Sequence, residues 1–187
     1  NIGINKNGHP PFAGQDTVEL PTKYSTRLYL IDEEKIREKM SIYVNAISEN
    51  FPSGSMPLYA SKALCFKKIY TIAAEEHMGV DVVSPGELYT ALQAGFPMEK
   101  VFFHGNNKTD ADIEFAIENQ IGYFVCDNLD ELDAIDETAE RHGIVQKILL
   151  RLTPGIDPHT HVKISTGKVD SKFGIAIETG QADEAIK

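Results

Sequence analysis

Short apolar runs alternate with amphipathic stretches along most of this chain, and this alternation limits the possible folds more than any other feature. Five runs are typical of buried strands, and they lie at residues 58–60, 79–83, 100–104, 122–126 and 147–152. The stretches between them, near 66–77, 86–94, 109–119 and 129–142, have the apolar spacing of helices. Strands that alternate with helices in this way form a parallel sheet with helices packed on it. The pattern therefore predicts the α/β class.

Two α/β architectures fit this pattern, a TIM barrel and an open doubly wound sheet. An open nucleotide-binding sheet is expected to have a glycine-rich turn after its first strand, and the sequence has none there. In a barrel, the functional groups collect at the carboxyl ends of the strands. Polar residues follow the predicted strands in that manner, namely Lys62, Asp81 and Ser84, His104 to Asn107, Asp127 and Asn128, and Arg151 and Thr153. We therefore favour a (β/α)8 barrel.

Five strands cannot close an eight-stranded barrel without leaving an unpaired edge and an uncovered interior. We therefore expect a partial barrel, about five strands of eight, from the front portion of a longer protein. Residues 28–187 form this truncated barrel in our prediction, and a last helix begins near Gly180.

The first residues differ in composition from the rest. Residues 1–27 are rich in Asn, Gly, Pro and Thr, and we expect a lead-in segment that belongs to a second, β domain. Thr17–Leu20 is a strand candidate in that segment, and Leu28–Ile31 is a second, buried one. Asp32 is then expected to cap a helix from Glu33 to about Ser48.

Composition excludes several classes of partner. With 28 acidic and 18 basic residues the net charge is −10, which opposes binding to nucleic acid or to an anionic membrane. The longest apolar runs contain charged residues and are too short to span a bilayer. Cys65 and Cys126 lie far apart, so the sequence supports neither a disulfide framework nor a zinc site. We expect a soluble cytoplasmic protein that binds neither nucleic acid nor membrane.

Lys62 is the most informative candidate residue. It follows the first predicted barrel strand in the run Tyr59-Ala-Ser-Lys-Ala63. A lysine buried at a strand end can lose its proton and attack a carbonyl group to form a Schiff base. The simpler interpretation of Lys62 alone is a lysine that extends its stem along the strand end and leaves its ammonium in water. Lys62 alone does not decide between the two.

Six motifs in a fixed order along the chain favour the Schiff-base interpretation of Lys62. They are Tyr59-Ala-Ser-Lys-Ala63, Asp81-Val-Val-Ser-Pro-Gly-Glu-Leu88, Phe103-His-Gly-Asn-Asn-Lys108, Leu150-Arg-Leu-Thr-Pro-Gly155, His159-Thr-His-Val-Lys-Ile-Ser-Thr-Gly167 and Asp170-Ser-Lys-Phe-Gly174. Together they resemble the alanine-racemase-like, fold-type III enzymes that use pyridoxal phosphate and, within them, the diaminopimelate decarboxylases. The resemblance extends from about Leu28 to the end of the chain.

The resemblance implies roles for single residues. Lys62 holds pyridoxal 5'-phosphate as a Schiff base and later moves protons as an acid or base. Asp81, His104 and Arg151 are expected to contact the cofactor. Many members of the family have Asn two residues after the lysine, whereas this chain has Leu64.

The resemblance also implies a supporting charge network. Asp81 and Glu87 resemble an acidic pair, and we expect Arg151 and Lys172 to be its basic partners, because a buried charge needs a counter-ion. Simpler interpretations remain open for three of the candidates. Asp81 could be a solvated loop acid, Glu87 a helix N-terminal acid and His104 a hydrogen-bonded structural histidine.

Residues 157–171 are polar and contain Pro158 and Gly167, so they read as a loop. The resemblance implies that this loop lies over the active site as a lid, with His161, Ser165 and Thr166 near the substrate. The two histidines of the loop lack a third ligand at a suitable spacing, so we expect no metal.

The implied activity is the decarboxylation of meso-2,6-diaminopimelate to L-lysine, by a homodimer that takes a small amino-acid substrate. The phosphate-binding glycines and the partner of the pyridinium nitrogen are expected outside this chain, so the chain alone is expected to be inactive. Two alternatives stay open. One is another enzyme of the same fold type, an ornithine- or arginine-type decarboxylase or an amino-acid racemase. The other is a barrel protein that carries pyridoxal phosphate without catalysis.

Overall fold

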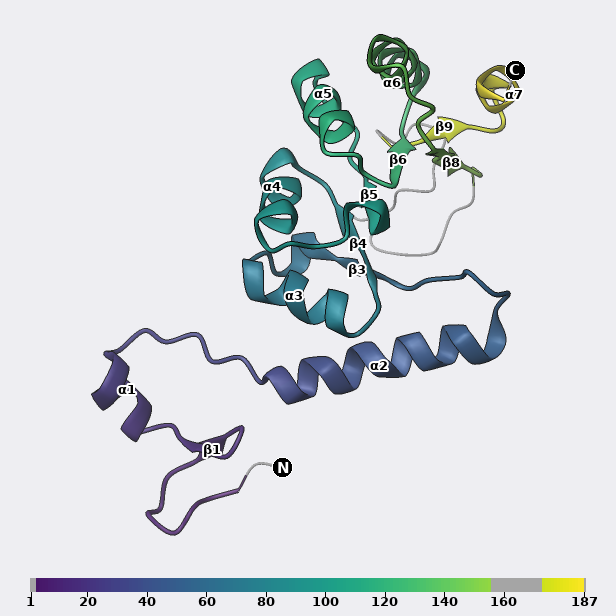
Figure 1. Ribbon diagram of the computed structural model, residues 1–187. Coiled ribbons are helices and arrows are strands. Elements are labelled where there is room, and N and C mark those ends of the chain that lie inside the picture. The colour runs from purple at the N-terminus through teal and green to yellow at the C-terminus, as the bar shows by residue number, and fades with distance from the viewer. Residues whose placement is uncertain (1–2, 156–172, 187) are drawn as a thin grey trace.

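The computed structural model describes residues 3–155 and 173–186 (Figure 1). Its strands are β1 (Pro11–Phe12), β2 (Gln15–Asp16), β3 (Leu58–Ala60), β4 (Gly79–Val82), β5 (Val101–Phe103), β6 (Tyr123–Cys126), β7 (Ile148–Leu150), β8 (Leu152–Thr153) and β9 (Ile175–Ala176). Its α-helices are α1 (Glu19–Tyr24), α2 (Glu33–Asn50), α3 (Lys67–Glu75), α4 (Pro85–Gln93), α5 (Asp110–Glu118), α6 (Leu129–His142) and α7 (Gln181–Ala185), and the short 3₁₀ helices are η1 (Ser61–Ala63) and η2 (Met98–Lys100).

The main sheet has the predicted strands in sequence order, β3-β4-β5-β6-β7, and all neighbours are parallel. A helix follows each of the first four strands, so the chain consists of successive βαβ units (Figure 1). The predicted α/β class and the helices that become α3 to α6 are confirmed. The helix expected near Gly180 is also present, as α7.

The sheet continues beyond the fifth strand. Arg151 lies between β7 and β8; its N–H donates to the Cys126 carbonyl at 2.9 Å, and its carbonyl accepts from Ile175 N–H at 2.8 Å. Strands β7 and β8 therefore act as one bent strand between β6 and β9, and β9 is parallel to β8. The sequence reading missed β9, because a strand of two residues has too few positions to show an alternating pattern.

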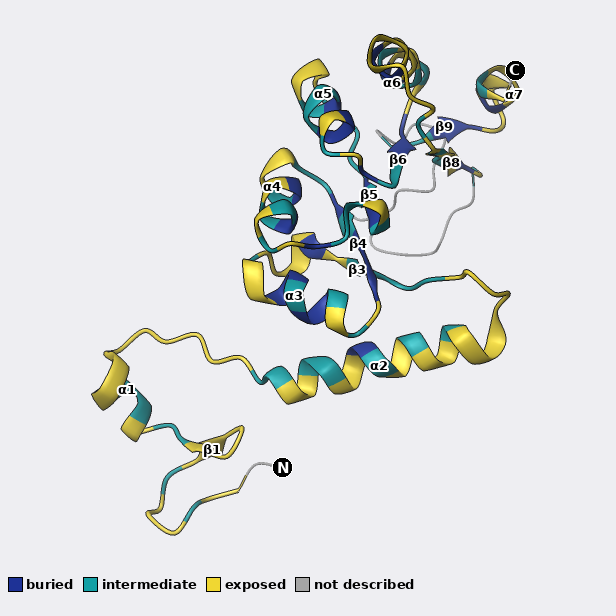
Figure 2. Ribbon diagram, viewed as in Figure 1, coloured by how far each residue is buried: buried dark blue, intermediate teal, exposed yellow. Residues whose placement is uncertain are grey.

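One face of the sheet is buried by helices α3 to α6 (Figure 2). The strand side chains on that face belong to the core, and they include Val80, Val82, Val101, Phe103, Phe124 and Cys126. Each apolar side chain of this size contributes roughly 2 kcal/mol when it leaves water. Side chains alternate along a strand, so Asp81, Phe102 and Tyr123 lie on the opposite face. No described helix covers that face.

Side-chain caps start the helices where the sequence placed them. Asp32 accepts from Lys35 N–H at 3.0 Å at the start of α2, as predicted. Ser84, Thr109 and Asn128 do the same for α4, α5 and α6. Each cap satisfies a backbone donor that the first helical turn leaves without a partner.

Helix α2 lies across the end of α3 and is fastened there by Arg37. The guanidinium contacts Glu33 at 2.7 Å within α2 and Glu76 at 2.9 Å beside α3, and it also pairs with Glu75. Within the described part of the chain, no helix, α2 included, is both long and apolar enough to cross a membrane.

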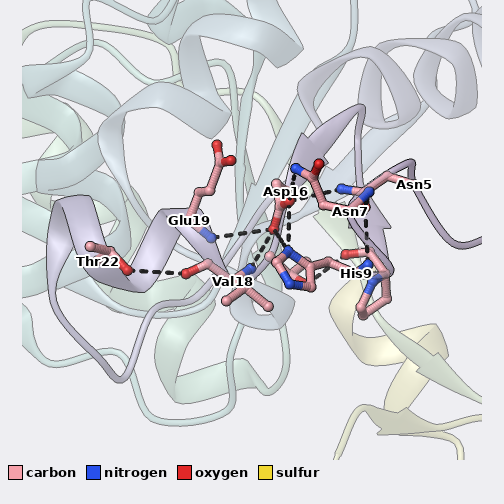
Figure 3. Close-up of polar contacts among 9 residues, drawn as sticks. Asn5, Asn7, His9, Asp16, Val18, Glu19 and Thr22 are labelled. Atoms are coloured by element: carbon pink, nitrogen blue, oxygen red, sulfur yellow. Dashed lines mark hydrogen bonds and ion pairs between the residues drawn. The ribbon is translucent and has the colours of Figure 1, made fainter.

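The residues before α2 form a small unit around Asp16 (Figure 3). Its carboxylate accepts from Asn5 Nδ2 at 2.8 Å, from His9 Nδ1 at 2.9 Å and from Val18 N–H at 2.8 Å. Burial raises the pKa of this carboxyl, but the hydrogen bonds from Asn5 and His9 outweigh it and hold the pKa well below its usual value. This network closes the hairpin of β1 and β2.

Two strand predictions in this region are wrong. Thr17 and Val18 form a turn, and Glu19 and Leu20 begin α1. Leu28–Ile31 is not a strand, and its apolar side chains are exposed, with Tyr29 99% exposed. Residues with strand propensity form a strand only when a neighbour pairs with their backbone, and no described strand lies beside this segment.

Gly122 allows the closest backbone approach in the sheet. A Cβ at this position would overlap the Glu99 carbonyl oxygen and lie 2.7 Å from its carbonyl carbon. We therefore expect Gly122→Ala to lower the free energy of unfolding by about 2–4 kcal/mol in urea unfolding. The control is Gly86→Ala in α4, where the Cβ would meet only Ser84 Oγ at 3.9 Å. Equal effects of the two substitutions would contradict the steric argument.

Candidate active site

Lys62 lies at the carboxyl end of β3, in the short helix η1. Its side chain is exposed, so the burial expected from the sequence is not found among the described residues. The reason is the open face of the sheet, because no described element stands opposite this lysine. Its positive charge nevertheless lowers the pKa of both Asp81 and His104. The carboxyl ends of β3 to β7, with the residues that follow them, form the rim of the open face.

Asp81 is the central acid of the open face. It lies on β4 opposite Ala60 of β3 and Phe102 of β5, and 22% of its side chain is exposed. Among the described residues its Oδ1 is buried without a hydrogen-bond partner. Burial raises the pKa of Asp81 to about 6, against the opposing effect of Lys62. A carboxyl group left in this state is suited to a cationic or hydrogen-bonding ligand on the open face.

His104 follows β5 and faces Asp81 across the rim. Its Nε2 lies 3.9 Å from Asp81 Oδ1, which is beyond hydrogen-bond distance. Burial, followed by the charge of Lys108, lowers the pKa of His104 to about 4. The imidazole is therefore neutral at pH 7 and able both to donate and to accept a hydrogen bond.

Glu87 does not pair with Arg151, one of its two predicted partners, and the other, Lys172, lies outside the described residues. Its Oε2 accepts from Val83 N–H at 3.0 Å and from the hydroxyl of Ser61, and its backbone N–H is capped by Ser84. No described Lys or Arg lies within ion-pair distance of Glu87. This acid instead joins the segments that follow β3 and β4, because its place in the first turn of α4 brings its carboxylate to the Ser61 hydroxyl and the Val83 N–H. Ser61 directly precedes Lys62, so Glu87 fixes the turn that carries the lysine.

The partner predicted for Arg151 is also wrong. Its Nη1 donates to Asp127 Oδ1 at 3.0 Å, and its guanidinium lies 4.3 Å from the centre of the Phe173 ring. Asp127 is nearer than Asp81 because it ends β6, the strand next to Arg151. The charge of Arg151 still lowers the pKa of Asp81, so both belong to the same rim.

Three residues of this rim were missed as functional candidates. Asp127 is buried, and besides holding Arg151 it accepts from Gly174 N–H at 2.9 Å, which joins β6 to the segment before β9. Lys108 and Glu131 form a buried ion pair of 2.6 Å. The signal for Glu131 was available, since it stands three residues after the cap Asn128, as Glu87 stands after Ser84. The spacing between cap and glutamate does not predict which group each glutamate contacts.

Four predicted site residues, His161, Ser165, Thr166 and Lys172, lie outside the described residues. Among the described ones, the rim brings together Lys62, Asp81, His104 and Arg151. An open face with an unpartnered carboxyl oxygen, a neutral imidazole and an exposed amine suits a planar ring with a nitrogen and an aldehyde, as in pyridoxal phosphate. The described residues therefore fit the cofactor that the motifs imply.

Comparison with known proteins gives the same answer. A family model for the pyridoxal binding domain of pyridoxal-dependent decarboxylases matches residues 33–187. The diaminopimelate decarboxylase of Bacillus methanolicus is 47% identical over 184 residues, which cover 98% of this chain and 42% of that relative. The chain thus spans about two-fifths of the length of such relatives.

Solved structures confirm the fold. The structure of diaminopimelate decarboxylase from M. jannaschii in complex with L-lysine matches with a TM-score of 0.86 and 38% identity, over 100% of this chain and 43% of that one. A lysine/ornithine decarboxylase from Vibrio vulnificus, complexed with putrescine, matches 78% of this chain and 37% of that one. Its TM-score is 0.58 and its identity 23%, so that likeness is one of fold.

These matches confirm the predicted partial barrel and the resemblance to the diaminopimelate decarboxylases. The family model covers more than half of the chain and includes all four rim residues, Lys62, Asp81, His104 and Arg151. The chain therefore belongs to the pyridoxal-dependent decarboxylases, whose pyridoxal binding domain it matches from residue 33 onward.

Proposed function

We propose that this chain is the N-terminal part of a diaminopimelate decarboxylase, which uses pyridoxal phosphate to convert meso-2,6-diaminopimelate to L-lysine and carbon dioxide. The observation that carries the proposal is the rim, where Lys62 acts electrostatically on the unpartnered Asp81 and on the neutral His104. The sequence identity of 47% to a diaminopimelate decarboxylase supports this choice of substrate over ornithine or arginine.

Each rim residue has a role in this proposal. When bound, pyridoxal phosphate supplies an electron sink for the electrons left by the departing carboxylate. Lys62 Nζ holds the cofactor and, once released, carries protons at the rim. The neutral His104 and the Asp81 carboxyl orient the cofactor without adding a positive charge beside it. Ser61 and Glu87 keep the Lys62 turn in place, and Arg151 shapes the rim through Asp127.

The lid residues His161, Ser165 and Thr166 are proposed to contact the substrate, and Lys172 to complete the charge network. These assignments come from the motifs alone.

Residues 28–187 are proposed to be the first part of a closed barrel. An apolar groove of about 780 Å³ lies along the free edge of β3 and is lined by residues such as Ile36, Met40, Leu58 and Tyr59. Further strands of a longer chain would pair with this edge and cover the groove. Residues 1–27 are proposed to join a β domain, in line with their hairpin and with exposed side chains such as Ile4 and Tyr24. We further propose a cytoplasmic homodimer.

Covalent labelling tests the role of Lys62. We expect borohydride reduction of the full-length protein with bound pyridoxal phosphate to fix the cofactor on Lys62, as shown by peptide mapping. Lys62→Arg keeps the charge but cannot form the reducible bond at neutral pH, so it should not be labelled. Lys67→Arg, a few residues away and exposed, is the matched control and should be labelled as the wild type is. A label on another lysine would refute the assignment.

Carbon dioxide release tests the substrate. The full-length protein is expected to release it from meso-diaminopimelate and not from ornithine or arginine, because each would leave polar groups of the site without partners. Lys62→Arg should reduce the rate by at least about 10³-fold. Release from ornithine at an equal rate would favour the alternative decarboxylase, and labelled protein without any release would favour a cofactor carrier. The chain of 187 residues by itself is expected to show no activity.

The raised pKa of Asp81 predicts a pH effect on stability. Because its pKa is about 6 in the folded protein and 3.8 as the ordinary value, the folded state holds this proton more tightly. Ionised Asp81 therefore destabilises the cofactor-free protein increasingly from about pH 4 to pH 6. Asp81→Asn should raise the free energy of unfolding at pH 7 by on the order of 1 kcal/mol and leave it unchanged at pH 4.

Urea unfolding of the cofactor-free, full-length protein at several pH values measures this difference. Asp133→Asn, an exposed position on α6, is the control and should show no comparable gain. A loss of stability in Asp81→Asn at pH 7 would show that the carboxylate has a stabilising partner.

A further inference from the structure

The ion pair between Lys108 and Glu131 is the most deeply buried pair of charges in the described part of the chain. Only 1% of the Lys108 side chain and 4% of the Glu131 side chain are exposed. Transferring two charges from water into the protein interior costs free energy, and replacing such a buried ion pair by neutral residues often leaves stability unchanged. A buried pair is therefore weak evidence for a stabilising role and invites another explanation.

All three ammonium donors of Lys108 are used. Nζ donates to Glu131 Oε1 at 2.6 Å, to the Gly105 carbonyl at 2.8 Å and to the Val125 carbonyl at 3.0 Å. The pairing of β5 with β6 ends at Phe103 and Phe124, so the next β6 carbonyl on that side has no strand donor. Lys108 replaces the missing donor and ties β6 to the loop after β5.

This loop carries His104. Its Gly105 has a φ of +109°, and a Cβ there would lie 3.3 Å from the Val83 carbonyl oxygen, so the loop lies tightly against the end of β4. One bond of the Lys108 ammonium holds the Gly105 carbonyl. The ammonium thus fixes the residue next to His104, while Glu131 fixes the ammonium.

Glu131 in turn is held by the end of β6. Its Oε2 accepts from Asp127 N–H at 3.3 Å, as Glu87 Oε2 accepts from Val83 N–H at 3.0 Å at the end of β4. The two glutamates occupy the same position in α6 and α4, three residues after the cap. Glu87 reaches the turn of Lys62 through Ser61, and Glu131 reaches the loop of His104 through Lys108. A glutamate three residues after a helix cap thus supports the segment of Lys62 in one case and the segment of His104 in the other.

The charged groups that face His104 are Lys108 in its own loop, Arg151 after β7, Asp127 after β6, Lys62 after β3 and Asp81 on β4. Lys108 has the largest effect of the charges, and it lowers the pKa of His104. Removing its charge therefore favours the protonated imidazole, which would bring a positive charge to the cofactor side of the rim.

We propose that Lys108 and Glu131 are positioning residues of the cofactor site, which hold the loop at residues 104–107 against the rim. The identity of the ligand, pyridoxal phosphate, rests on the proposed function. The contacts of Lys108 with the loop, with β6 and with Glu131 do not depend on that identity.

The test uses the full-length protein and the double variant Lys108→Met/Glu131→Gln, which removes both charges and leaves no unpaired carboxylate in the core. The His104 pKa is measured by NMR with labelled histidine, assigned with His104→Gln, and the dissociation constant of pyridoxal phosphate is measured by absorbance. We expect a folded protein in which the His104 pKa rises above about 4, because the charge of Lys108 is gone, while burial still holds it below the ordinary 6.5. The dissociation constant should rise about tenfold, because the loop is displaced.

The matched control is Arg141→Met, which breaks the exposed pair of Arg141 in α6 with Glu114 in α5. It should change neither value. A folded double variant with the His104 pKa and cofactor affinity of the wild type would overturn the proposal. So would a raised pKa with unchanged affinity, or a double variant that cannot fold, since the pair would then serve the fold itself. If the wild type binds no pyridoxal phosphate, the proposed function fails, yet the His104 pKa still tests the charge effect.

Discussion

The packing of helices α3 to α6 on one face of the parallel sheet is the interaction on which the rest of the structure depends. It buries alternate side chains of every main strand, such as Val80, Val82 and Phe103, and so determines which residues lie on the other face. Asp81 is on that other face because it stands between two buried valines. The parallel direction of all strands then brings their carboxyl ends, and the polar residues after them, to one rim.

The acids of this rim differ in their partners, and this difference separates supporting groups from available ones. Asp127 holds Arg151 and Gly174, Glu131 holds Lys108, and Glu87 holds Ser61 and the backbone of β4. Each of these three joins one strand end to another segment. Asp81 has a buried oxygen with no hydrogen-bond partner in the described residues, and it lies beside Lys62 on the open face. A buried carboxyl oxygen without a partner indicates a group that binds a ligand and not one that supports the fold.

The open face and the free edge of β3 have a common cause. Helices cover one face only, and the described strands follow one another without returning to β3, so both the interior face and the first edge remain uncovered. The groove beside β3 and the stacked Phe102 and Tyr123 rings, 4.4 Å apart, are apolar surfaces of the kind that a closed barrel buries. The match to about two-fifths of the related decarboxylases agrees with this arrangement.

The sequence by itself determined the order and type of the main elements, because the apolar period, the cap residues and the strand lengths are local properties. It also determined the motifs that place Lys62, Asp81, His104 and Arg151 in one family. It did not predict β9 or the exposure of Leu28–Ile31, since strand formation depends on a neighbour that the local pattern does not contain.

Only the tertiary structure decided which charges meet. Arg151 was expected to pair with Asp81 or Glu87, yet it meets Asp127, which ends the adjacent strand. Lys108 and Glu131 are 23 residues apart and form a buried pair that no spacing rule identifies. Whether a charged side chain finds a partner depends on distances of a few ångströms across strand ends, and these are set by how the sheet twists and how the helices pack, not by the order of residues along the chain.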